Sequence, residues 1–180
     1  PNPVVVIDGR SGAGKSSLGA RIAAAWPLPR PPQLIALDSI YPGWDGLDAG
    51  ADHAIDAILR PHALGIEGAW QRWDWTASAV ADVQPVAVDR GGIIEGCGIL
   101  RPGIEDLASV RLWVESGETE RKKRALARDG ETYRPHWDRW AAHEDALLAD
   151  DPAADLVVDV VGGLERRLTR TEHAYARWPT

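Results

Sequence analysis

The stretch Gly9-Arg10-Ser11-Gly12-Ala13-Gly14-Lys15-Ser16 decides the fold, because it matches the pattern G-x-x-x-x-G-K-[ST] in full. It follows the apolar run Val4-Val5-Val6-Ile7 and precedes a helix-like stretch at residues 18–25. A buried strand, a glycine-rich turn and a helix start together place backbone N–H groups and the positive end of a helix dipole around one point. The sequence therefore predicts a phosphate-binding loop that holds a nucleotide.

The residue types of this loop suit a polyphosphate. Its glycines allow positive φ and a close approach of the backbone to a ligand. Lys15 can reach the outer phosphates, and the hydroxyl of Ser16 can bind Mg²⁺. The expected nucleotide cradle comprises Gly9, Ser11, Gly12, Ala13, Gly14, Lys15, Ser16 and Ser17. The alternative, a glycine-rich turn that merely caps a helix, is disfavoured because the strand and the helix both stand where the motif requires them.

Length and composition predict one compact domain over residues 1–180, since 180 residues with 44% apolar content can bury one substantial core. A net charge of -7 argues against non-specific binding of nucleic acid. No apolar run approaches the roughly 20 residues of a membrane span, and the amino terminus lacks a secretion pattern. The single cysteine, Cys97, is consistent with a reducing compartment. We therefore expect a cytoplasmic protein that binds neither nucleic acid nor membrane, and the oligomeric state stays open.

Strand-like and helix-like segments alternate along the chain. Core strands are predicted at residues 4–8, 33–37, 92–95, 110–114 and 155–158. Helices are predicted after the loop and at 50–64, 119–128, 137–149 and 164–178, and two extended segments that can pair with each other at 69–75 and 84–88. This alternation predicts a three-layer α/β/α fold with a mainly parallel five-stranded sheet. Ligands of such sheets bind beyond the carboxyl ends of the strands.

Two carboxylates stand at that edge of the predicted sheet. Asp38 follows the second strand, where it can face the terminal phosphate and accept a proton from an attacking hydroxyl. Glu95 closes the third strand, where a second acid can orient Mg²⁺ or its waters. The alternative for each is a cap on a loop or a helix start. Asp8 and Asp89 also end extended segments, and this capping role is the one favoured for them.

Three arginines follow the fourth strand. Arg121, Arg124 and Arg128 have the spacing i, i+3, i+7 and therefore share one face of the predicted helix. A planar, permanently charged guanidinium suits phosphate oxygens, so we expect an arginine-rich lid over about residues 117–136. The alternative is a solvated surface helix, which is disfavoured because the protein is acidic overall and the cluster falls where a lid belongs.

Several of these segments resemble one family. The phosphate loop, Asp38-Ser39-Ile40-Tyr41, Trp73-Asp74-Trp75, Glu95-Gly96 and the stretch from Arg124 to Asp129 occur in the order and approximate spacing of the uridine kinase-like P-loop kinases. The likeness covers roughly residues 4–160. That family, within the P-loop NTPase superfamily, uses ATP and Mg²⁺ to phosphorylate the 5′-hydroxyl of a nucleoside or a comparable hydroxyl of another small metabolite.

The residue patterns described above predict roles for Lys15, Ser16, Glu95 and Arg121, and the resemblance implies roles for Asp38, Tyr41, Asp45, Trp75, Arg124 and Arg128. The catalytic set is Asp38 as base, Lys15 on the phosphates, and Arg124 and Arg128 as lid cations. The expected metal ligands are Ser16 and Glu95. The groups around the small hydroxyl acceptor are Tyr41, Asp45, Trp75, Glu95 and Arg121, where Asp45 takes the place of the acid that holds sugar hydroxyls.

The chain also departs from the family pattern. Ile40 stands where an aromatic is typical, and Trp73-Asp74-Trp75 is followed by Thr76 in place of the expected His and Arg. Phosphoryl-transfer machinery is therefore predicted, whereas recognition of uracil or cytosine has no supporting residue. A nucleoside monophosphate kinase, a kinase of another small metabolite and a non-catalytic ATP-binding module remain alternatives, although a binding module has no need of Asp38 or the arginines.

A GTP-driven switch is disfavoured. Asp89-Arg90-Gly91-Gly92 satisfies the pattern D-x-x-G, but the only asparagine of the chain is Asn2. The Asn-Lys-x-Asp motif expected from a resemblance to GTPases is therefore absent from this sequence.

Three tryptophans and the predicted helix that follows the lid can each be assigned either to packing or to a pocket. Trp44, Trp73 and Trp75 either stack on a flat acceptor ring or fill the core of a chain that contains no Phe. A helical stripe favours packing over a pocket and contains Trp137, Trp140, Ala141, Glu144, Leu147 and Leu148.

Overall fold

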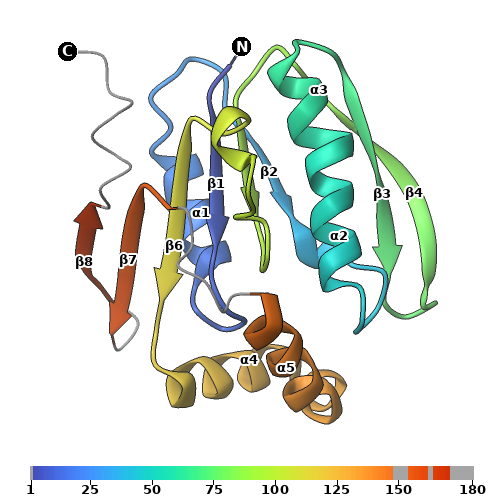
Figure 1. Ribbon diagram of the computed structural model, residues 1–180, viewed down its shortest axis with the longest axis vertical. Helices are drawn as coiled ribbons and strands as arrows, with labels where there is room; N and C mark the ends of the chain where they lie inside the picture. Colours follow the sequence, from blue (N-terminus) through green and yellow to red (C-terminus); the bar gives the residue numbers. More distant parts are fainter. Residues whose placement is uncertain (1, 148–153, 162–163, 171–180) are drawn as a thin grey trace.

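The computed structural model describes residues 2–147, 154–161 and 164–170. Its main sheet has the strand order β2-β5-β1-β6-β7-β8 (Figure 1). Five neighbouring strands run parallel, namely β2 (Gln33–Ala36), β5 (Gly92–Glu95), β1 (Val4–Asp8), β6 (Val110–Glu115) and β7 (Leu156–Val161). β8 (Leu164–Arg170) joins β7 antiparallel at one edge. The predicted mainly parallel sheet is confirmed, with one additional edge strand.

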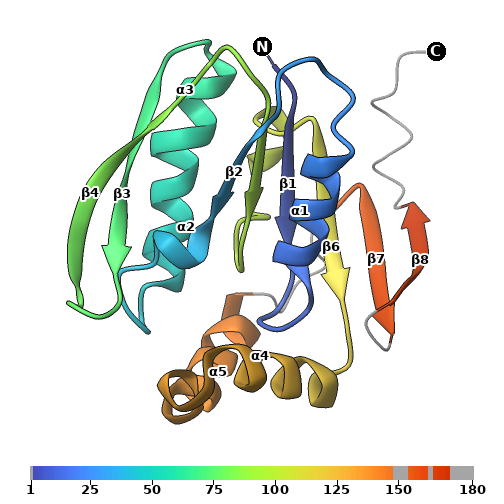
Figure 2. The ribbon, with the colours of Figure 1, turned by 180° about the vertical axis from the view of Figure 1, so that it is seen from behind.

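Alternate side chains of β1 pack into two hydrophobic cores, one on each face of the sheet. Val5 and Ile7 belong to the core that also contains Leu18 of α1 (Lys15–Ala24). Val4 and Val6 belong to the other core, which the helical segment after β2 covers. Figure 2 shows α1 in front of the sheet, and Figure 1 shows it behind. Because side chains alternate across a strand, a continuous apolar run such as β1 signals burial on both faces, and the three-layer arrangement is confirmed.

The helical segment after β2 is continuous but irregular. It comprises α2 (Leu47–Ala54), a π-helical turn (Ile55–Leu59) and α3 (Arg60–Ala63), and it confirms the predicted helix at 50–64. Pro61 lies at the start of α3 and has no backbone N–H. A proline therefore cannot continue the regular hydrogen-bond ladder, which accounts for the wider turn just before it.

The two extended segments in the middle of the chain pair with each other, as the sequence predicts. β3 (Gly68–Asp74) and β4 (Ala79–Val86) form a separate antiparallel hairpin with an irregularity between Gln71 and Trp73. The side chain of Asp74 accepts hydrogen bonds from the backbone N–H groups of Thr76 and Ala77, which fixes the turn between the strands.

Two helices after β6 cross the end of the sheet toward which β1 and β6 point (Figures 1 and 2). They are α4 (Glu118–Tyr133) and α5 (Trp137–Leu147), joined by the 3-10 turn η4 (Arg134–His136). Gly130 has non-helical dihedrals and kinks α4 before its last turn. The helices predicted at 119–128 and 137–149 are thus observed as far as the described residues extend. None of the helices in the described ranges combines the length and apolarity needed to span a bilayer.

The helix predicted at 164–178 is wrong over the part that the structure describes. Residues 164–170 form β8, and their Cα positions pair with β7, for example Leu168 with Val158. Leucines four residues apart fit a helical period, but the free edge of β7 offers backbone partners that a local pattern does not reveal. Residues 171–178 lie outside the described part of the chain.

Candidate functional site

The glycine-rich loop between β1 and α1 has the backbone that its sequence predicts. Gly9 and Gly12 have φ values of +147° and +75°. A Cβ at Gly9 would collide with the carbonyl oxygen of Val114, and one at Gly12 with that of Arg121. Only glycine therefore fits at either position. Through these contacts the loop packs closely against the end of β6 and the start of α4.

The Lys15 ammonium lies buried beneath this loop. Its Nζ donates hydrogen bonds to the carbonyl oxygens of Gly9 at 2.8 Å and Arg10 at 3.2 Å, and it lies 3.3 Å from Cys97 Sγ. Burial lowers the pKa of Lys15, but the neighbouring Cys97, Glu95 and other acidic groups outweigh it and raise that pKa above its ordinary value. Lys15 is therefore a fixed positive charge at the loop.

Ser16 and Glu95 form a pair of oxygens beside this lysine. Ser16 Oγ donates a hydrogen bond of 2.8 Å to Glu95 Oε1. Burial raises the pKa of Glu95 more than the charge of Lys15 and the bond from Ser16 lower it. Among the described residues, no cluster of three or more His, Cys, Asp and Glu side chains could hold a metal by itself. The pair fits Mg²⁺, which typically takes one or two protein oxygens and completes its shell with phosphate and water.

Asp8 has the structural role that the sequence favours for it. Its Oδ1 accepts hydrogen bonds from the backbone of Gly9 at 2.6 Å and Gly98 at 3.0 Å, and its Oδ2 accepts one from Leu100 at 2.8 Å. The carboxyl group is fully buried, and this burial raises its pKa more than the hydrogen bonds lower it. Asp8 thus ties the phosphate loop to the turn that follows β5.

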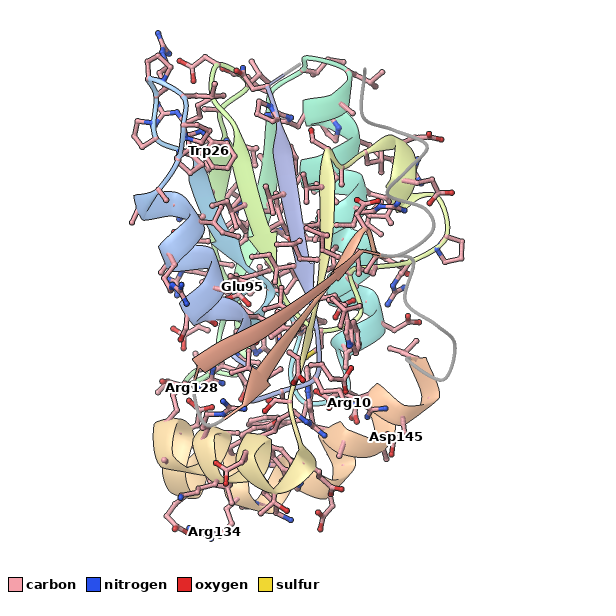
Figure 3. The ribbon with its side chains drawn as sticks, turned by 90° about the vertical axis from the view of Figure 1, so that its left-hand side faces the viewer. Arg10, Trp26, Glu95, Arg128, Arg134 and Asp145 are labelled. Carbon is pink, nitrogen blue, oxygen red and sulfur yellow. The ribbon has the colours of Figure 1, made fainter. Side chains whose placement is uncertain are left out.

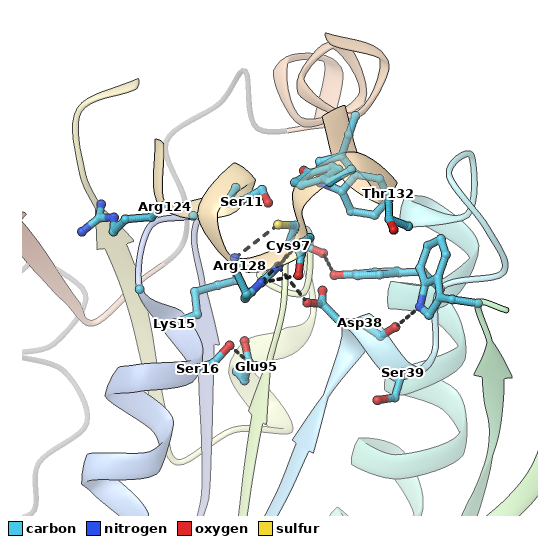
Figure 4. Close-up of a pocket in the computed structure, with 18 of the residues that line it drawn as sticks. Ser11, Lys15, Ser16, Asp38, Ser39, Glu95, Cys97, Arg124, Arg128 and Thr132 are labelled. Atoms are coloured by element: carbon cyan, nitrogen blue, oxygen red, sulfur yellow. Dashed lines mark hydrogen bonds and ion pairs between the residues drawn. The ribbon is translucent and has the colours of Figure 1, made fainter. Parts of the chain in front are cut away.

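A cavity of about 770 Å³ opens where the loop, the ends of β2 and β5, and α4 meet (Figure 4). Most of the predicted site residues line it, namely Ser11, Gly12, Gly14, Lys15, Ser16, Ser17, Asp38, Tyr41, Trp75, Glu95, Arg124 and Arg128. Gly9 and Ala13 contribute to the loop behind this wall. Asp45 and Arg121 are not at the wall.

Asp38 and Arg128 face each other across the cavity (Figure 4). Asp38 lies in the short 3-10 turn η1 (Leu37–Ser39), which directly follows β2. Its Oδ2 lies 3.6 Å from Nη2 of Arg128, and the two side chains are 57% and 51% exposed. Arg128 also pairs with Asp129 at 2.7 Å. A carboxylate and a guanidinium are therefore both accessible to a ligand in this cavity.

The other two arginines of α4 point elsewhere. Arg124 lines the cavity, but its guanidinium donates a hydrogen bond to Ser116 Oγ, and Figure 4 shows it turned away from Asp38. Arg121 is buried, with Nη1 bonded to the carbonyl oxygen of Ser11 at 3.2 Å and Nε to that of Ser116 at 3.1 Å. The prediction that Arg121 contacts the substrate is thus corrected. Helical spacing identifies a shared face, but the close approach of Gly12 to the backbone of α4 at Arg121 decides which residue on that face is buried.

The structure also contradicts the prediction that Asp45 holds hydroxyls of the acceptor, because Asp45 does not line the cavity. Its carboxylate is 61% exposed, pairs with Arg139 of α5 and lies 3.7 Å from His143 Nε2. The abbreviated segment after Tyr41 carries Asp45 outward, so that it links two surface segments and does not line the cavity.

Aromatic rings form the wall of the cavity away from Lys15. The Trp44 ring stacks nearly parallel to the Tyr133 and His136 rings, at centroid distances of 5.2 Å and 4.4 Å, and lies 4.7 Å from Trp75. Trp44, Trp75, Tyr133 and Trp140 line the cavity, whereas Trp73 does not. The sequence does not identify Tyr133 and Trp140 as site residues, because the stripe containing Trp140 indicates packing and Tyr133 follows the kink of α4 at Gly130.

Comparison with known proteins supports the fold. No family model matches the chain, and no curated protein does. Among solved structures, a possible uridine kinase from Bacillus stearothermophilus is similar at a TM-score of 0.56 and 15% identity, covering 87% of this chain and 88% of that one. A sugar kinase from Janibacter sp. (TM-score 0.48, 17% identity, 88% and 86% covered) and a gluconokinase from Sinorhizobium meliloti (0.45, 18%, 89% and 83%) also match. The first of these similarities, at a TM-score of 0.56, shows that the chain has the P-loop kinase fold that its sequence predicts.

Proposed function

We propose that the protein is an ATP-dependent phosphotransferase that moves the γ-phosphoryl group of ATP to a hydroxyl of a small acceptor, most favourably a nucleoside or a nucleoside-like compound. The observation that carries the proposal is the meeting of Lys15, the Ser16–Glu95 pair, Asp38 and Arg128 in one cavity. Phosphoryl transfer needs phosphate binding, a place for Mg²⁺, a base and a cation that offsets the developing charge, and these groups supply one of each.

The loop binds the nucleotide phosphates in this proposal. The amides from Gly12 to Ser16 and the amino end of α1 converge on anionic oxygens. Lys15 is held charged by its acidic neighbours and exchanges its bonds to Gly9 and Arg10 for phosphate oxygens. The loop amides are fixed before the reaction begins, so they stabilise developing negative charge without further reorganisation.

Ser16 and Glu95 are the residues that would hold a magnesium ion. Their oxygens are already 2.8 Å apart, and both line the cavity next to Lys15. A magnesium ion held by these two oxygens would supply positive charge next to the phosphates. Glu95 must be ionised for this role, and the positive charge of Lys15 favours its ionised form.

Asp38 is the proposed base, and Arg128 the cation that offsets charge on the transferred group. The Asp38 carboxylate is accessible and can accept a proton from an acceptor hydroxyl between it and the phosphates. Arg128 lies 3.6 Å away and can reach the same phosphoryl oxygens from the helix that covers the cavity. A helix over the cavity also limits the access of water, which competes with the acceptor.

The acceptor occupies the aromatic part of the cavity. Tyr41, Trp44, Trp75 and Tyr133 present flat apolar surface, while Ser39 and Thr132 add hydroxyl groups. Such a wall suits an acceptor with a flat ring joined to a polar, hydroxylated part. This composition is the reason for favouring a nucleoside-like acceptor over an open-chain sugar acid.

The test is ADP release by the purified protein with Mg·ATP and a panel of nucleosides, nucleoside monophosphates, sugars, sugar acids and pantothenate-like alcohols. The proposal expects acceptor-dependent ADP release that is highest with a ring-bearing alcohol. Activity with monophosphates alone would select a nucleoside monophosphate kinase. Binding of Mg·ATP without acceptor-dependent release across the panel would leave a nucleotide-binding module and overturn the kinase.

A further inference from the structure

Glu144 of α5 is a buried carboxylate that the proposed reaction does not use. It is 1% exposed. Its Oε1 accepts hydrogen bonds from the backbone N–H of Ser11 at 2.6 Å, from Trp140 Nε1 at 3.0 Å and from Cys97 Sγ at 3.2 Å. A carboxylate so deeply buried is costly unless it is paired and hydrogen-bonded, and here the donors come from the phosphate loop, α5 and the turn after β5.

Arg121 of α4 completes the arrangement. Its Nη1 lies 3.8 Å from Glu144 Oε2 and donates to the carbonyl oxygen of Ser11 at 3.2 Å. The backbone N–H and the backbone carbonyl of a single loop residue, Ser11, are thus held by opposite charges from two helices. These helices lie more than a hundred residues further along the chain, since Arg121 and Glu144 are 110 and 133 positions after Ser11.

The geometry points to positioning and not to proton transfer. Neither Glu144 nor Arg121 lines the cavity, whereas Ser11 does. Three donors already occupy Oε1 of Glu144. One of these donors, Cys97, contacts the Nζ of Lys15, so the carboxylate contacts the loop directly at Ser11 and is linked to Lys15 through Cys97.

We propose that Glu144 and Arg121 form a clamp that fixes the shape of the phosphate loop when α4 and α5 are docked on it. Without the clamp, the Ser11 peptide is free to rotate, and the amides that follow it no longer converge on the phosphates. Docking of the two helices and binding of the nucleotide then favour each other by the same free energy, because coupling between two binding events is reciprocal. The clamp rests on the proposed function only for the identity of its ligand.

The chain offers a matched control for this clamp. Arg10 of the loop pairs with Asp145 of α5, so an ion pair at the surface joins the loop to the same helix that carries Glu144 (Figure 3). The side chains of Arg10 and Asp145 are 26% and 70% exposed. An exposed pair contributes little, whereas breaking a buried, hydrogen-bonded pair leaves an unmatched charge.

The experiment is calorimetric titration of the wild type, Glu144→Gln, Arg121→Lys and Asp145→Asn with Mg·ADP, which binds without turnover. Glu144→Gln keeps the shape of the side chain but removes the charge that Ser11 and Arg121 share. Loss of a buried charge-assisted hydrogen bond predicts roughly ten- to hundredfold weaker binding in Glu144→Gln and in Arg121→Lys. Loss of an exposed pair predicts a change of about twofold or less in Asp145→Asn.

Hydrogen exchange of the Ser11 amide in the nucleotide-free wild type provides a second readout that needs no variant. The clamp predicts slow exchange there and faster exchange in Glu144→Gln. Fast exchange in the wild type would overturn the clamp even if both clamp variants failed to fold. The clamp would also be overturned if Glu144→Gln melted at a lower temperature but bound Mg·ADP as tightly as the wild type, because Glu144 would then contribute to packing alone. A wild type that binds no Mg·ADP would instead refute the nucleotide site itself.

Discussion

Substitution of Asp38 by Asn separates the proposed base from every other part of the site. The carboxylate is 57% exposed, and its ion pair with Arg128 has a length of 3.6 Å between half-exposed groups. Exposed pairs contribute about 0–1 kcal/mol to stability, so the free energy of unfolding should change by no more than that. In a domain of this size such a change moves the melting temperature by about 4 °C or less.

The effect on the rate should be far larger. A positioned general base contributes typically about 10²–10⁴-fold, so kcat of Asp38→Asn should fall by that factor with the best acceptor. The Asp38 main-chain carbonyl, which accepts a 2.7 Å hydrogen bond from Trp75, is retained in the variant, so the acceptor wall stays in place. The affinity for Mg·ATP should not weaken, because the variant removes a negative charge near the phosphates.

The assay is steady-state ADP release with Asp45→Asn as the matched control. This control removes a carboxylate from the same connecting segment, but at a position that does not line the cavity. It should retain wild-type kcat. If Asp38→Asn kept kcat within a few-fold of the wild type, the assignment of Asp38 as the base would be wrong. If both variants lost activity equally, the loss would reflect general charge and not proton transfer.

Three further substitutions test other parts of the account. Lys15→Met should lower kcat by about 10²–10³-fold, as expected for loss of a charge that stabilises the transferred group, and wild-type turnover would contradict its role. Glu95→Gln should raise the Mg²⁺ concentration needed for half-maximal rate. Because burial raises the pKa of Glu95, the folded state favours its protonated form, and this stabilising contribution is lost as pH rises above the ordinary value of 4.5. Glu95→Gln should therefore melt at a higher temperature than the wild type at pH 7, with the difference vanishing toward pH 4.5, and a lower melting temperature at pH 7 would count against this reading. Trp44→Leu removes stacking on Tyr133 and His136, worth about 0.5–1.5 kcal/mol per ring pair, and should raise KM for the acceptor but not for ATP; a selective rise in KM for ATP would place the acceptor elsewhere.

The sequence predicts those features that local pattern and sheet topology determine together. The phosphate loop can be predicted from the sequence because its glycines, Lys15 and Ser16 are required locally, by the backbone conformation of the loop and by the phosphates that it binds. Asp38 and Glu95 are found because the carboxyl ends of parallel strands meet at one edge, so residues far apart in sequence must come together there. The register of β1 with β5, which pairs Ile7 with Glu95, brings the carboxylate beside the loop.

The sequence does not predict features that depend on how a helix packs against the rest of the fold. Helical spacing gives Arg121 and Arg128 the same face, but the approach of Gly12 to the backbone of α4 buries the first and leaves the second in the cavity. Glu144 sits in an apolar stripe and looks like a packing position until its partners, Ser11 and Arg121, are known. Long-range polar contacts of this kind leave no periodic signal in a single sequence.

Phosphoryl transfer by this protein can be tested by following the γ-phosphoryl group itself. The protein is mixed in single-turnover amounts with Mg²⁺ and ATP labelled at the γ position, together with the acceptor that gives the fastest ADP release. If the protein is a phosphotransferase, the label leaves ATP and appears on the acceptor, in equal amount to the ADP formed. Label that appears only as inorganic phosphate, or that stays on ATP while the nucleotide is bound, would contradict this proposal.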